Sequence, residues 1–529
     1  MSFSSKVGSE SFLISLLLFS IVCLGYYCMS LSQTDGHYIY LIDDAYIHLA
    51  MAKHFALNDV WGITKYEFSS TSSSPLFTYI LSVLIKIFGN NDQIPLYFNA
   101  VFGVGTVYIL NQYFSGHFNL IKNIVLSVLF TLFFSVLHLQ VLMGMEHVFH
   151  VFLFVLNIFC LSNFKNKYSI FGFYLSLLLM GLVRFESMFY FAILACVFAL
   201  IKKWKEGFLT LIVGFIPIAI FCYFNYQHDG FLFPNSVLVK GTKFTFDSNL
   251  PHQIKSILLD NFLFNISFYK IGFFPNIICV IFILRDFKKK SLQDLIKDNF
   301  LLIVISLLMI CHSMFADLKG NFRYEAYILV GFSMALIPKL KGFFENFKTY
   351  IEKEKLVSVL ILMNVFLLIY KVAFAHKLLV NGGKNIYEQQ IQSAKFLHTY
   401  YNESRVVAND IGAISYFTDI HLLDIVGLGS KEMIPFSENK KPLDLNFENF
   451  LTQYTINNKY DIAVIYDEWF QGYVPKTWKK AAVLKIKNVI SVSKDEVSIY
   501  SINPDNLQSL KQNIKNFKWN KNVQVTIVD

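Results

Sequence analysis

Residues 43–46 read Asp-Asp-Ala-Tyr, and they follow the first long apolar run of the chain, Ser11 to Leu31. The two adjacent carboxylates, Asp43 and Asp44, stand at the start of an amphipathic stretch. Beside a membrane-spanning helix, such acids are expected to meet a substrate, a cation or a helix end, because ionisable groups are costly near lipid. The partner of this pair therefore decides how the polar part of the sequence is interpreted.

The composition is that of a multi-spanning membrane protein. Of the 529 residues, 55% are hydrophobic, 56 are Phe and 16% are charged, against about 25% charged in an ordinary soluble domain. The net charge of +9 is modest and spread through loops, which favours a positive-inside membrane topology over nucleic-acid binding. We therefore expect the lipid bilayer as a partner and no nucleic acid.

Apolar runs predict an α-helical multi-pass body of about 11–13 transmembrane helices. The candidate spans are 11–31, 75–89, 94–112, 121–141, 147–162, 168–184, 187–201, 207–226, 266–284, 299–315, 326–340 and 355–375. The first run lacks a small-residue cleavage site, which predicts a retained anchor. Several runs are shorter than the roughly 17 residues that cross a bilayer, so some are not expected to cross fully.

The character of the sequence changes after residue 375. Residues 1–375 are predicted to form the membrane body, and residues 376–529 a C-terminal soluble α/β domain, with Gly382-Gly383 marking the change. Period-2 apolar stretches predict strands at 405–408, 421–426, 461–466, 482–486 and 497–500. Helical patterns fall between them, at roughly 386–401 and 446–458.

Basic clusters fix much of the topology. Lys202–Lys205, Arg285–Lys290 and Lys339–Lys355 are placed inside, because cytoplasmic loops collect Lys and Arg. Five polar segments then share the outer face, namely 142–147, 184–187, 227–265, 316–325 and the C-terminal domain. The same rule, applied literally, puts residues 32–74 inside, so one segment between 75 and 142 is not expected to span.

The polar motifs of these segments occur in a definite order. They are Asp43-Asp44-Ala45-Tyr46-Ile47, Thr71 to Pro75-Leu76, Gly144-Met145-Glu146, Arg184-x-Glu186, Pro234-Asn235-Ser236 with Lys240, Arg323-Tyr324, Asp410-Ile411-Gly412 and Asp424-x-x-Gly427-Leu428. In this order they resemble bacterial GT-C-fold integral-membrane glycosyltransferases, and most of all the terminal arabinofuranosyltransferase branch. The third motif, usually Arg-Pro-Glu-Gly in that branch, reads Arg184-Phe185-Glu186-Ser187 here.

The resemblance implies an enzyme of the bacterial inner (cell) membrane. It implies a polyprenyl-monophosphate sugar as donor, and a glycan, lipid or protein as acceptor. It also implies that the active site and the C-terminal domain lie on the periplasmic or extracellular side, with the chemistry carried by the acidic motif of the first outer loop.

The residue types fit glycosyl transfer. A carboxylate can take the proton of an attacking hydroxyl, and we expect Asp44 to be this base, with Asp43 orienting it or binding acceptor or cation. The leaving lipid phosphate needs positive charge, for which Arg184, Lys240 and Arg323 are the candidates. Further candidate substrate-binding residues are Tyr46 and Tyr324, which could stack on a sugar ring, and Glu146, Glu186 and Asn235. Two adjacent carboxylates could also share a divalent cation such as Mg, Mn or Ca.

Each of these assignments has a structural alternative. Asp43 could cap the N-terminus of a helix running from about 44 to 56. Glu146 and Glu186 could be membrane-edge acids paired with Arg184, and Lys240 and Arg323 could be headgroup anchors. Asp410, where a strand meets a glycine, is by default a turn residue.

Two other functions remain open at this stage. One is a transporter or flippase of a lipid-linked or polar solute. Transporters carry charges near the bilayer midplane, whereas the charges here gather in loops and at segment ends, which favours the enzyme. The other is a structural role for the C-terminal domain, which leaves the acids of the loops unexplained.

Overall fold

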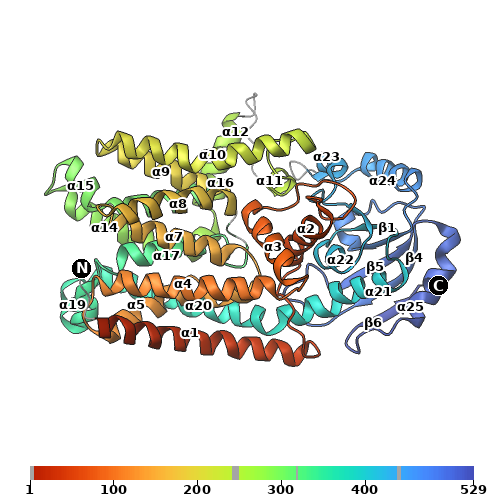
Figure 1. Ribbon diagram of the computed structural model, residues 1–529, viewed down its shortest axis with the longest axis horizontal. Coiled ribbons are helices and arrows are strands. Elements are labelled where there is room, and N and C mark those ends of the chain that lie inside the picture. The colour runs from red at the N-terminus through yellow and green to blue at the C-terminus, as the bar shows by residue number, and fades with distance from the viewer. Residues whose placement is uncertain (1–4, 241–249, 317, 319, 438–441, 529) are drawn as a thin grey trace.

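Two parts make up the molecule, a long bundle of apolar helices and a mixed β-sheet that closes one end of it (Figure 1). The computed structural model describes residues 5–240, 250–316, 318, 320–437 and 442–528. We call the end of the bundle that meets the sheet, at the right in Figure 1, the sheet end, and the opposite end the far end. The fold class predicted from the sequence, a helical membrane body with a C-terminal α/β domain, is confirmed.

The bundle is built from helices between residues 5 and 400. They are α1 (Ser5–Gln33), α2 (Asp44–Asn58), α3 (Pro75–Phe88), α4 (Ile94–Ser115), α5 (Ile121–Phe134), α6 (Leu137–Met143), α7 (His147–Ser162), α8 (Lys167–Val183), α9 (Ser187–Leu200), α10 (Trp204–Asp229), α11 (Asn235–Lys240), α12 (Leu250–Ser256), α13 (Ile266–Ile271), α14 (Phe273–Phe287), α15 (Leu292–Asp298), α16 (Phe300–Phe315), α17 (Ala326–Leu336), α18 (Lys341–Glu345), α19 (Phe347–Lys353), α20 (Lys355–Ile386) and α21 (Gln392–Tyr400). π-helical turns at Ile257–Leu263 and Tyr387–Ile391 lie between α12 and α13 and between α20 and α21.

The apolar helices of the described residues match the predicted spans one for one. Four are long and apolar enough to cross a membrane, three more qualify as bent pairs, and five are shorter apolar helices. Each of these twelve segments overlaps one of the twelve predicted spans. The number of helices that cross the membrane is therefore the number of these twelve segments that run from one end of the bundle to the other.

Helix α3 does not run between the two ends. Near the start of α3, the hydroxyl of Thr78 lies 3.1 Å from Nδ1 of His48 in α2. Just after the end of α3, the Asn90 side chain accepts a hydrogen bond from the hydroxyl of Tyr416 in the C-terminal domain at 2.9 Å. Both ends of α3 thus lie at the sheet end. This identifies 75–89 as the segment between 75 and 142 that does not span, whereas four helices, or seven when each bent pair is taken as one span, are long and apolar enough to cross a membrane among the described residues.

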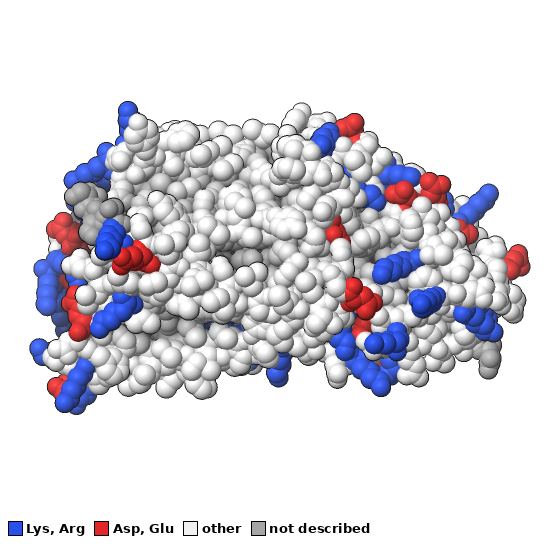
Figure 2. Space-filling view, turned by 60° about the horizontal axis from the view of Figure 1, so that its bottom comes forward, with Lys and Arg blue, Asp and Glu red and all other residues white. Residues whose placement is uncertain are grey.

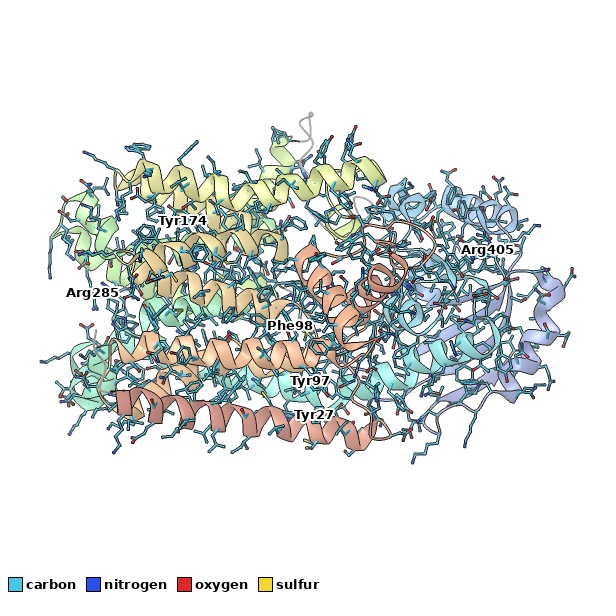
Figure 3. The ribbon with its side chains drawn as sticks, in the orientation of Figure 1. Tyr27, Tyr97, Phe98, Tyr174, Arg285 and Arg405 are labelled. Atoms are coloured by element: carbon cyan, nitrogen blue, oxygen red, sulfur yellow. The ribbon has the colours of Figure 1, made fainter. Side chains whose placement is uncertain are left out.

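When α3 is not counted as a crossing segment, successive loops lie alternately at the sheet end and the far end. Residues 34–74 join the other polar loops at the sheet end, and the three basic clusters lie at the far end, where Figure 3 labels Arg285. Figure 2 shows charged side chains gathered at the two ends of one face, with a nearly charge-free band between them. Such a band is the surface that a bilayer covers.

The inside of the bundle is packed with aromatic rings. Phe98 of α4 is 8% exposed and lies 5.4 Å from Phe77 of α3 and 5.3 Å from Phe149 of α7 between ring centroids. Its neighbour Tyr97 is 63% exposed and points outward (Figure 3). Adjacent residues on a helix face different directions, so one packs in the core while the other meets the surroundings.

The C-terminal domain holds one six-stranded sheet. Its strands are β1 (Arg405–Ala408), β2 (His421–Asp424), β3 (Ile462–Ile465), β4 (Lys479–Lys485), β5 (Glu496–Ser501) and β6 (Gln524–Ile527), in the order β2-β1-β3-β5-β4-β6. Strand β1 is parallel to β2 and β3, and the other pairs are antiparallel. The helices are α22 (Gly412–Phe417), α23 (Ile434–Ser437), α24 (Leu445–Asn457) and α25 (Leu507–Asn516), and short 3-10 turns lie at Lys431–Met433, Asp467–Phe470 and Pro504–Asn506. The five predicted strands are confirmed to within three residues, and β6 was not predicted.

No break separates the two parts of the chain at residue 375. One helical path runs from Lys355 to Tyr400, from the far end into the C-terminal domain. Gly382 and Gly383, expected to mark a change, lie inside α20. A Cβ on Gly383 would lie 2.7 Å from the carbonyl oxygen of Ile39, so the glycine allows the first loop to approach the helix backbone.

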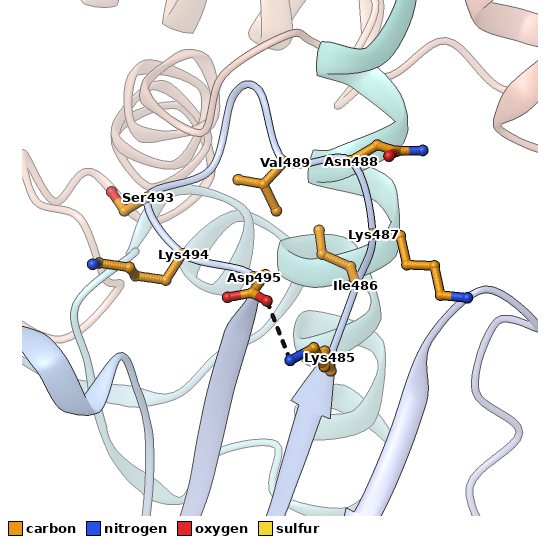
Figure 4. Close-up of a pocket in the computed structure, with 8 residues that line it drawn as sticks. All are labelled: Lys485, Ile486, Lys487, Asn488, Val489, Ser493, Lys494 and Asp495. Carbon is orange, nitrogen blue, oxygen red and sulfur yellow. Dashed lines mark ion pairs between the residues drawn. The ribbon is translucent and has the colours of Figure 1, made fainter.

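The turn between β4 and β5 fastens the sheet to this helix. Figure 4 shows residues 485–495 of this turn close to the helical path. The side chain of Asn385 accepts a bond from the Ile490 N–H at 2.9 Å, and Ser491 donates to the Gly382 carbonyl at 2.9 Å. The sheet is therefore held on the same helix that crosses the bundle.

Candidate functional site

The site is assembled at the sheet end from loops far apart in the sequence. Helix α2 begins at Asp44, and Asp43 occupies the position before it. The Asp43 side chain makes no hydrogen bond to α2, so the predicted capping of that helix is wrong. Its two oxygens instead accept bonds from the N–H groups of Gly412 at 2.6 Å and Ala413 at 2.8 Å, at the start of α22.

Asp43 thus ties the membrane body to the C-terminal domain. The approach is so close that a Cβ on Gly412 would lie 2.2 Å from the backbone oxygen of Asp43. Burial, then the nearby charge of Asp410, raises the pKa of Asp43 to about 8, although the two N–H bonds oppose the shift. A carboxylate with both oxygens engaged in this way is poorly placed to accept a substrate proton.

Asp44 faces a different environment. Its Oδ2 lies 2.8 Å from Nη2 of Arg323, and its side chain is 33% exposed. The same Nη2 donates to the hydroxyl of Tyr324 at 3.1 Å. Of the adjacent pair, Asp44 is therefore the carboxylate that a molecule entering the site can reach.

Arg323 keeps part of its hydrogen-bonding capacity open. Its side chain is 11% exposed, and its Nε and Nη1 are buried without a hydrogen-bond partner among the described residues. Burial alone would lower the pKa of Arg323, but Tyr324 and Asp44 raise it above its ordinary value. The side chain is thus a fixed positive charge with unused N–H donors, the chemistry that binds phosphate oxygens.

Tyr324 connects the two arginines of the site. The guanidinium carbon of Arg323 and that of Arg184 each lie 5.0 Å from the centroid of the Tyr324 ring. Cation–π contacts at this distance are attractive and strengthen when the groups are withdrawn from water. The predicted phosphate-binding arginines are therefore neighbours across one ring, although they are 139 positions apart in the sequence.

Arg184 is paired with two carboxylates. It donates through Nη1 to Glu146 at 2.8 Å, and through Nε at 3.1 Å and Nη2 to Glu186. Burial would lower the pKa of Arg184, but Glu186 and Glu146 raise it. The predicted pairing of these acids with Arg184 is confirmed, and it occupies three of the five N–H donors of the arginine.

Glu146 is fully buried and has a second partner, His48. The Nε2 of His48 lies 3.3 Å from Oε2 of Glu146, and its Nδ1 lies 3.1 Å from the hydroxyls of Ser72 and Thr78. Burial raises the pKa of Glu146, but the adjacent histidines and Arg184 outweigh it and hold the pKa well below its ordinary value. Sequence reasoning did not assign His48 to this network, although its place four residues after Asp44, one turn further along a helix, is a signal for it.

Three other predicted substrate-binding residues lie differently. Tyr46 is fully buried, and its ring lies 5.5 Å from that of Tyr40, so in this structure it packs in the core. Asn235 is fully buried and donates from Nδ2 to the Leu428 carbonyl at 3.2 Å, joining α11 to the C-terminal domain. The backbone of Lys240 ends α11, and its side chain falls outside the described part of the structure.

The aspartates of the C-terminal motifs have different partners. Asp424 accepts bonds from the N–H groups of Val426 at 2.9 Å and Gly429 at 2.8 Å, and it shapes the loop whose Leu428 carbonyl meets Asn235. Asp410 accepts from Tyr466 at 2.7 Å and Gln390 at 2.6 Å. Both lie at the carboxyl ends of strands, but the side chain of Asp410, for which a turn role was the default expectation, bonds two distant side chains.

The two carboxylates of the acidic pair have other partners in this structure, and a shared cation stays a prediction. The oxygens of Asp43 face backbone N–H groups, whereas Asp44 faces Arg323. Among the described residues, no group of three or more His, Cys, Asp or Glu side chains has the arrangement of a metal site.

An open hollow on the C-terminal domain lies apart from this network. It is lined by Lys485, Ile486, Lys487, Asn488, Val489, Ser493, Lys494 and Asp495, and Lys485 and Asp495 form an ion pair at 3.4 Å (Figure 4). It belongs to the turn that packs on α20 and contains none of the predicted site residues.

Comparison with known proteins supports the fold. The crystal structure of ArnT from Cupriavidus metallidurans bound to undecaprenyl phosphate is similar, with a TM-score of 0.53, 10% sequence identity, and coverage of 92% of this chain and 98% of that one. Residues 384–500 match the model of a domain of unknown function, DUF8728. No curated protein matches the chain. The structural likeness supports the GT-C-type fold that the motifs predicted, whereas the arabinofuranosyltransferase branch stays a prediction.

Proposed function

We propose that this protein is a membrane glycosyltransferase that moves a sugar from a polyprenyl-monophosphate donor to a glycan, lipid or protein acceptor. The observation that carries the proposal is Arg323, a buried cation with two unused N–H donors, held 2.8 Å from the accessible carboxylate of Asp44. A phosphate-binding cation beside a base is the pair of groups that this reaction needs. The likeness to a structure that holds undecaprenyl phosphate supports the same donor class.

In the proposed reaction, a hydroxyl of the acceptor attacks the anomeric carbon of the donor sugar. The bond from that carbon to the phosphate oxygen breaks, and the lipid phosphate leaves with the electron pair. Asp44 takes the proton of the attacking hydroxyl, and Arg323 stabilises the charge that builds up on the leaving phosphate. Tyr324, whose ring centroid lies 5.0 Å from the guanidinium carbons of both arginines, is proposed to lie beside the sugar.

The two arginines then have different duties. Arg184 gives three of its five N–H donors to Glu146 and Glu186, so its proposed role is to position Tyr324. Arg323 shares one nitrogen with Asp44 and Tyr324 and offers the others to the donor. When a phosphate binds Arg323, it weakens the ion pair with Asp44 and leaves this carboxylate better able to accept a proton.

The arrangement of charge supports an extracytoplasmic site in a bacterial cell membrane. The clusters around Lys202, Arg285 and Lys339 lie at the far end, opposite the site. Cytoplasmic loops collect such residues, so the sheet end and the C-terminal domain are proposed to face the periplasm or the cell exterior.

The alternative function, transport or flipping of a lipid-linked or polar solute, has less support. A transporter places its ionisable groups near the bilayer midplane, where helices break around the solute. Here the network of Asp44, Arg184 and Arg323 lies where the helices end at the sheet. The side chain of Asp44, the proposed base, is 33% exposed there.

The test is a panel of polyprenyl-phosphate sugars offered to the purified full-length protein in detergent or nanodiscs. Transfer to an added glycan or lipid, or slow hydrolysis of one donor, is expected for the wild type and not for Asp44→Asn. If no donor binds or turns over while the protein moves lipid-linked sugars across a sealed vesicle, the transport alternative replaces the enzyme.

A further inference from the structure

A small polar pocket lies in the C-terminal domain, at the carboxyl ends of β1 and β3. Its lining includes Gln389, Gln390, Asn409, Asp410 and Tyr466. Strand β1 is flanked by parallel partners on both sides, since the chain passes from β1 to β2 and then across to β3. In α/β sheets, this crossover point at the carboxyl ends of the strands is where ligands bind.

The pocket is joined to the reactive pair by Asp410. Two and three positions after it in the chain, Gly412 and Ala413 hold the carboxylate of Asp43. Burial raises the pKa of Asp410, and the charge of Asp44 raises it further. The pocket therefore lies beside the segment that holds Asp43, next to the proposed base Asp44, where the sugar acceptor of the proposed transfer would bind.

Most polar groups of the pocket already have partners. The Tyr466 hydroxyl contacts Gln389 at 2.5 Å and Asp410 at 2.7 Å, and Gln390 donates from Nε2 to Asp410 at 2.6 Å. The backbone N–H of Tyr466 donates to Oδ1 of Asn409 at 3.0 Å. These bonds fix the orientation of both side-chain amides.

One donor and one acceptor of the pocket are left over. Nδ2 of Asn409 and Oε1 of Gln390 are buried and have no hydrogen-bond partner within the described residues. The two residues are 6% and 3% exposed. A buried polar atom without a partner costs about 1–3 kcal/mol, so the pair is expected to be satisfied by something that enters the pocket.

A hydroxyl group has the complementary chemistry. It can accept a bond from Nδ2 of Asn409 and donate its own hydrogen to Oε1 of Gln390. The free space of the pocket, about 10 Å³, is that of one water molecule or one hydroxyl, not of a sugar ring.

We infer that the pocket is an acceptor subsite that takes one hydroxyl of a polyhydroxylated acceptor, other than the hydroxyl that attacks the donor. This inference rests on the proposed glycosyl transfer and adds the acceptor class, a glycan or other polyol. It also gives the C-terminal domain a share in substrate selection. By holding a second hydroxyl, Asn409 and Gln390 fix which hydroxyl of the acceptor faces Asp44.

The main test combines one variant with deoxygenated acceptors. Asn409→Asp keeps the oxygen that accepts from Tyr466 and replaces the free N–H donor with an oxygen. Gln392→Glu is the matched control, because the Oε1 of Gln392 likewise accepts a backbone N–H, that of Asn520 at 3.1 Å, and Gln392 does not line the pocket. Both variants change one buried amide to a carboxyl group near the same helix.

With the wild type, we expect one monodeoxy acceptor to lose about tenfold in kcat/KM, the equivalent of one lost hydrogen bond. Asn409→Asp should raise the acceptor KM about tenfold, leave the donor KM unchanged and no longer distinguish that analogue. Gln392→Glu should behave like the wild type. If Asn409→Asp discriminates as the wild type does, the pocket holds a structural water only and the inference is overturned.

Two further measurements keep the test decisive. If Asn409→Asp fails to fold, the wild type with the set of monodeoxy acceptors decides alone, and equal rates for all of them would refute the subsite. If the wild type transfers sugar from no donor, the proposed function fails. Direct binding of free oligosaccharides then tests the subsite separately from the transfer reaction. Binding that the wild type has and Asn409→Asp lacks would support the subsite, whereas equal or absent binding would overturn it.

Discussion

At the residue scale, the neighbours of a side chain decide its role more than its type does. Asp43 and Asp44 are chemically identical and adjacent, yet one is held by two backbone N–H groups and the other meets an arginine. The sequence predicted that Asp44 is the base and left the duty of Asp43 open. It could not supply the partner of Asp43, because Gly412 lies 369 positions away and nothing local points to it.

The two aspartates should therefore respond differently to the same change. Asp44→Asn removes the base and should lower the transfer rate by about 10²–10⁴-fold without affecting the melting temperature. Asp43→Asn replaces one acceptor oxygen by an NH₂ group that faces a backbone N–H. It should keep measurable activity and lose about 1–3 kcal/mol of stability. Parallel assays of transfer and thermal unfolding check both, and equal loss of activity without loss of stability would contradict the division.

The two arginines offer a second matched pair. Arg323→Lys loses the planar set of donors and should raise the donor KM about tenfold while the acceptor KM stays unchanged. Arg184→Lys cannot satisfy Glu146 and Glu186 together, so it should lower the yield and the melting temperature before it affects donor binding. Kinetics with varied donor, set beside unfolding curves, distinguish the two. A selective donor effect in Arg184→Lys would reverse the assignment.

At the scale of elements, the apolar pattern predicted most of the structure. Helix α7 and strand β1 begin and end where their patterns do, because the period of 3.6 or 2 is carried by the residues themselves. The pattern failed where an element depends on distant contacts. Helix α3 is apolar enough for a short span yet stays at one end of the bundle, held there at both of its ends by His48 and Tyr416. The glycines of α20 suggested a boundary, although they allow the first loop to approach the backbone of this helix closely.

The start of α22 is the element most sensitive to a small change. A methyl group at Gly412 would overlap Asp43, so Gly412→Ala should cost about 1–3 kcal/mol through overpacking. It should also loosen the C-terminal domain, which limited proteolysis would report as earlier cleavage near residues 400–412. Gly25→Ala in α1 is the control, since a Cβ there meets nothing within 4 Å. Equal protease resistance of both variants would show that the contact does not hold the domain.

At the scale of the whole molecule, the site is an interface between the membrane body and the soluble domain. The sequence predicted that five polar segments share a face, because the basic clusters and the number of spans between them fix the side of each loop. It also brought Arg184, Glu146, Glu186, Arg323, Tyr324 and Asp44 into one list, and the structure brings these six side chains into one network. The roles of Gln390 and Asn409 were beyond reach, because they depend on which distant segments of the C-terminal domain meet.

The stability of this interface should depend on pH. The pKa of Asp43 is raised from 3.8 to about 8, so the folded protein holds this proton more tightly than the unfolded chain does. Between pH 4 and 8 the unfolded chain has already lost the proton, and stability therefore falls as the pH rises through this window.

Melting temperatures of the full-length protein between pH 5 and 8 should show this decline, and Asp43→Asn should flatten it. Asp424, whose pKa burial raises to about 6, contributes a decline of the same sign that remains in both proteins. Identical pH slopes in the wild type and Asp43→Asn would exclude the contribution of Asp43.

The bond between Asp43 and α22 also sets an order of events during synthesis. The two partners are separated by 369 positions, and every apolar segment of the bundle except α1 lies between them. At ribosome speeds of about 5–20 residues per second, roughly 20–70 s pass between the emergence of the first loop and that of its partner. For this time the loop that carries Asp43 waits without its partner, so the contact that joins the membrane body to the C-terminal domain forms only after the apolar segments have been made.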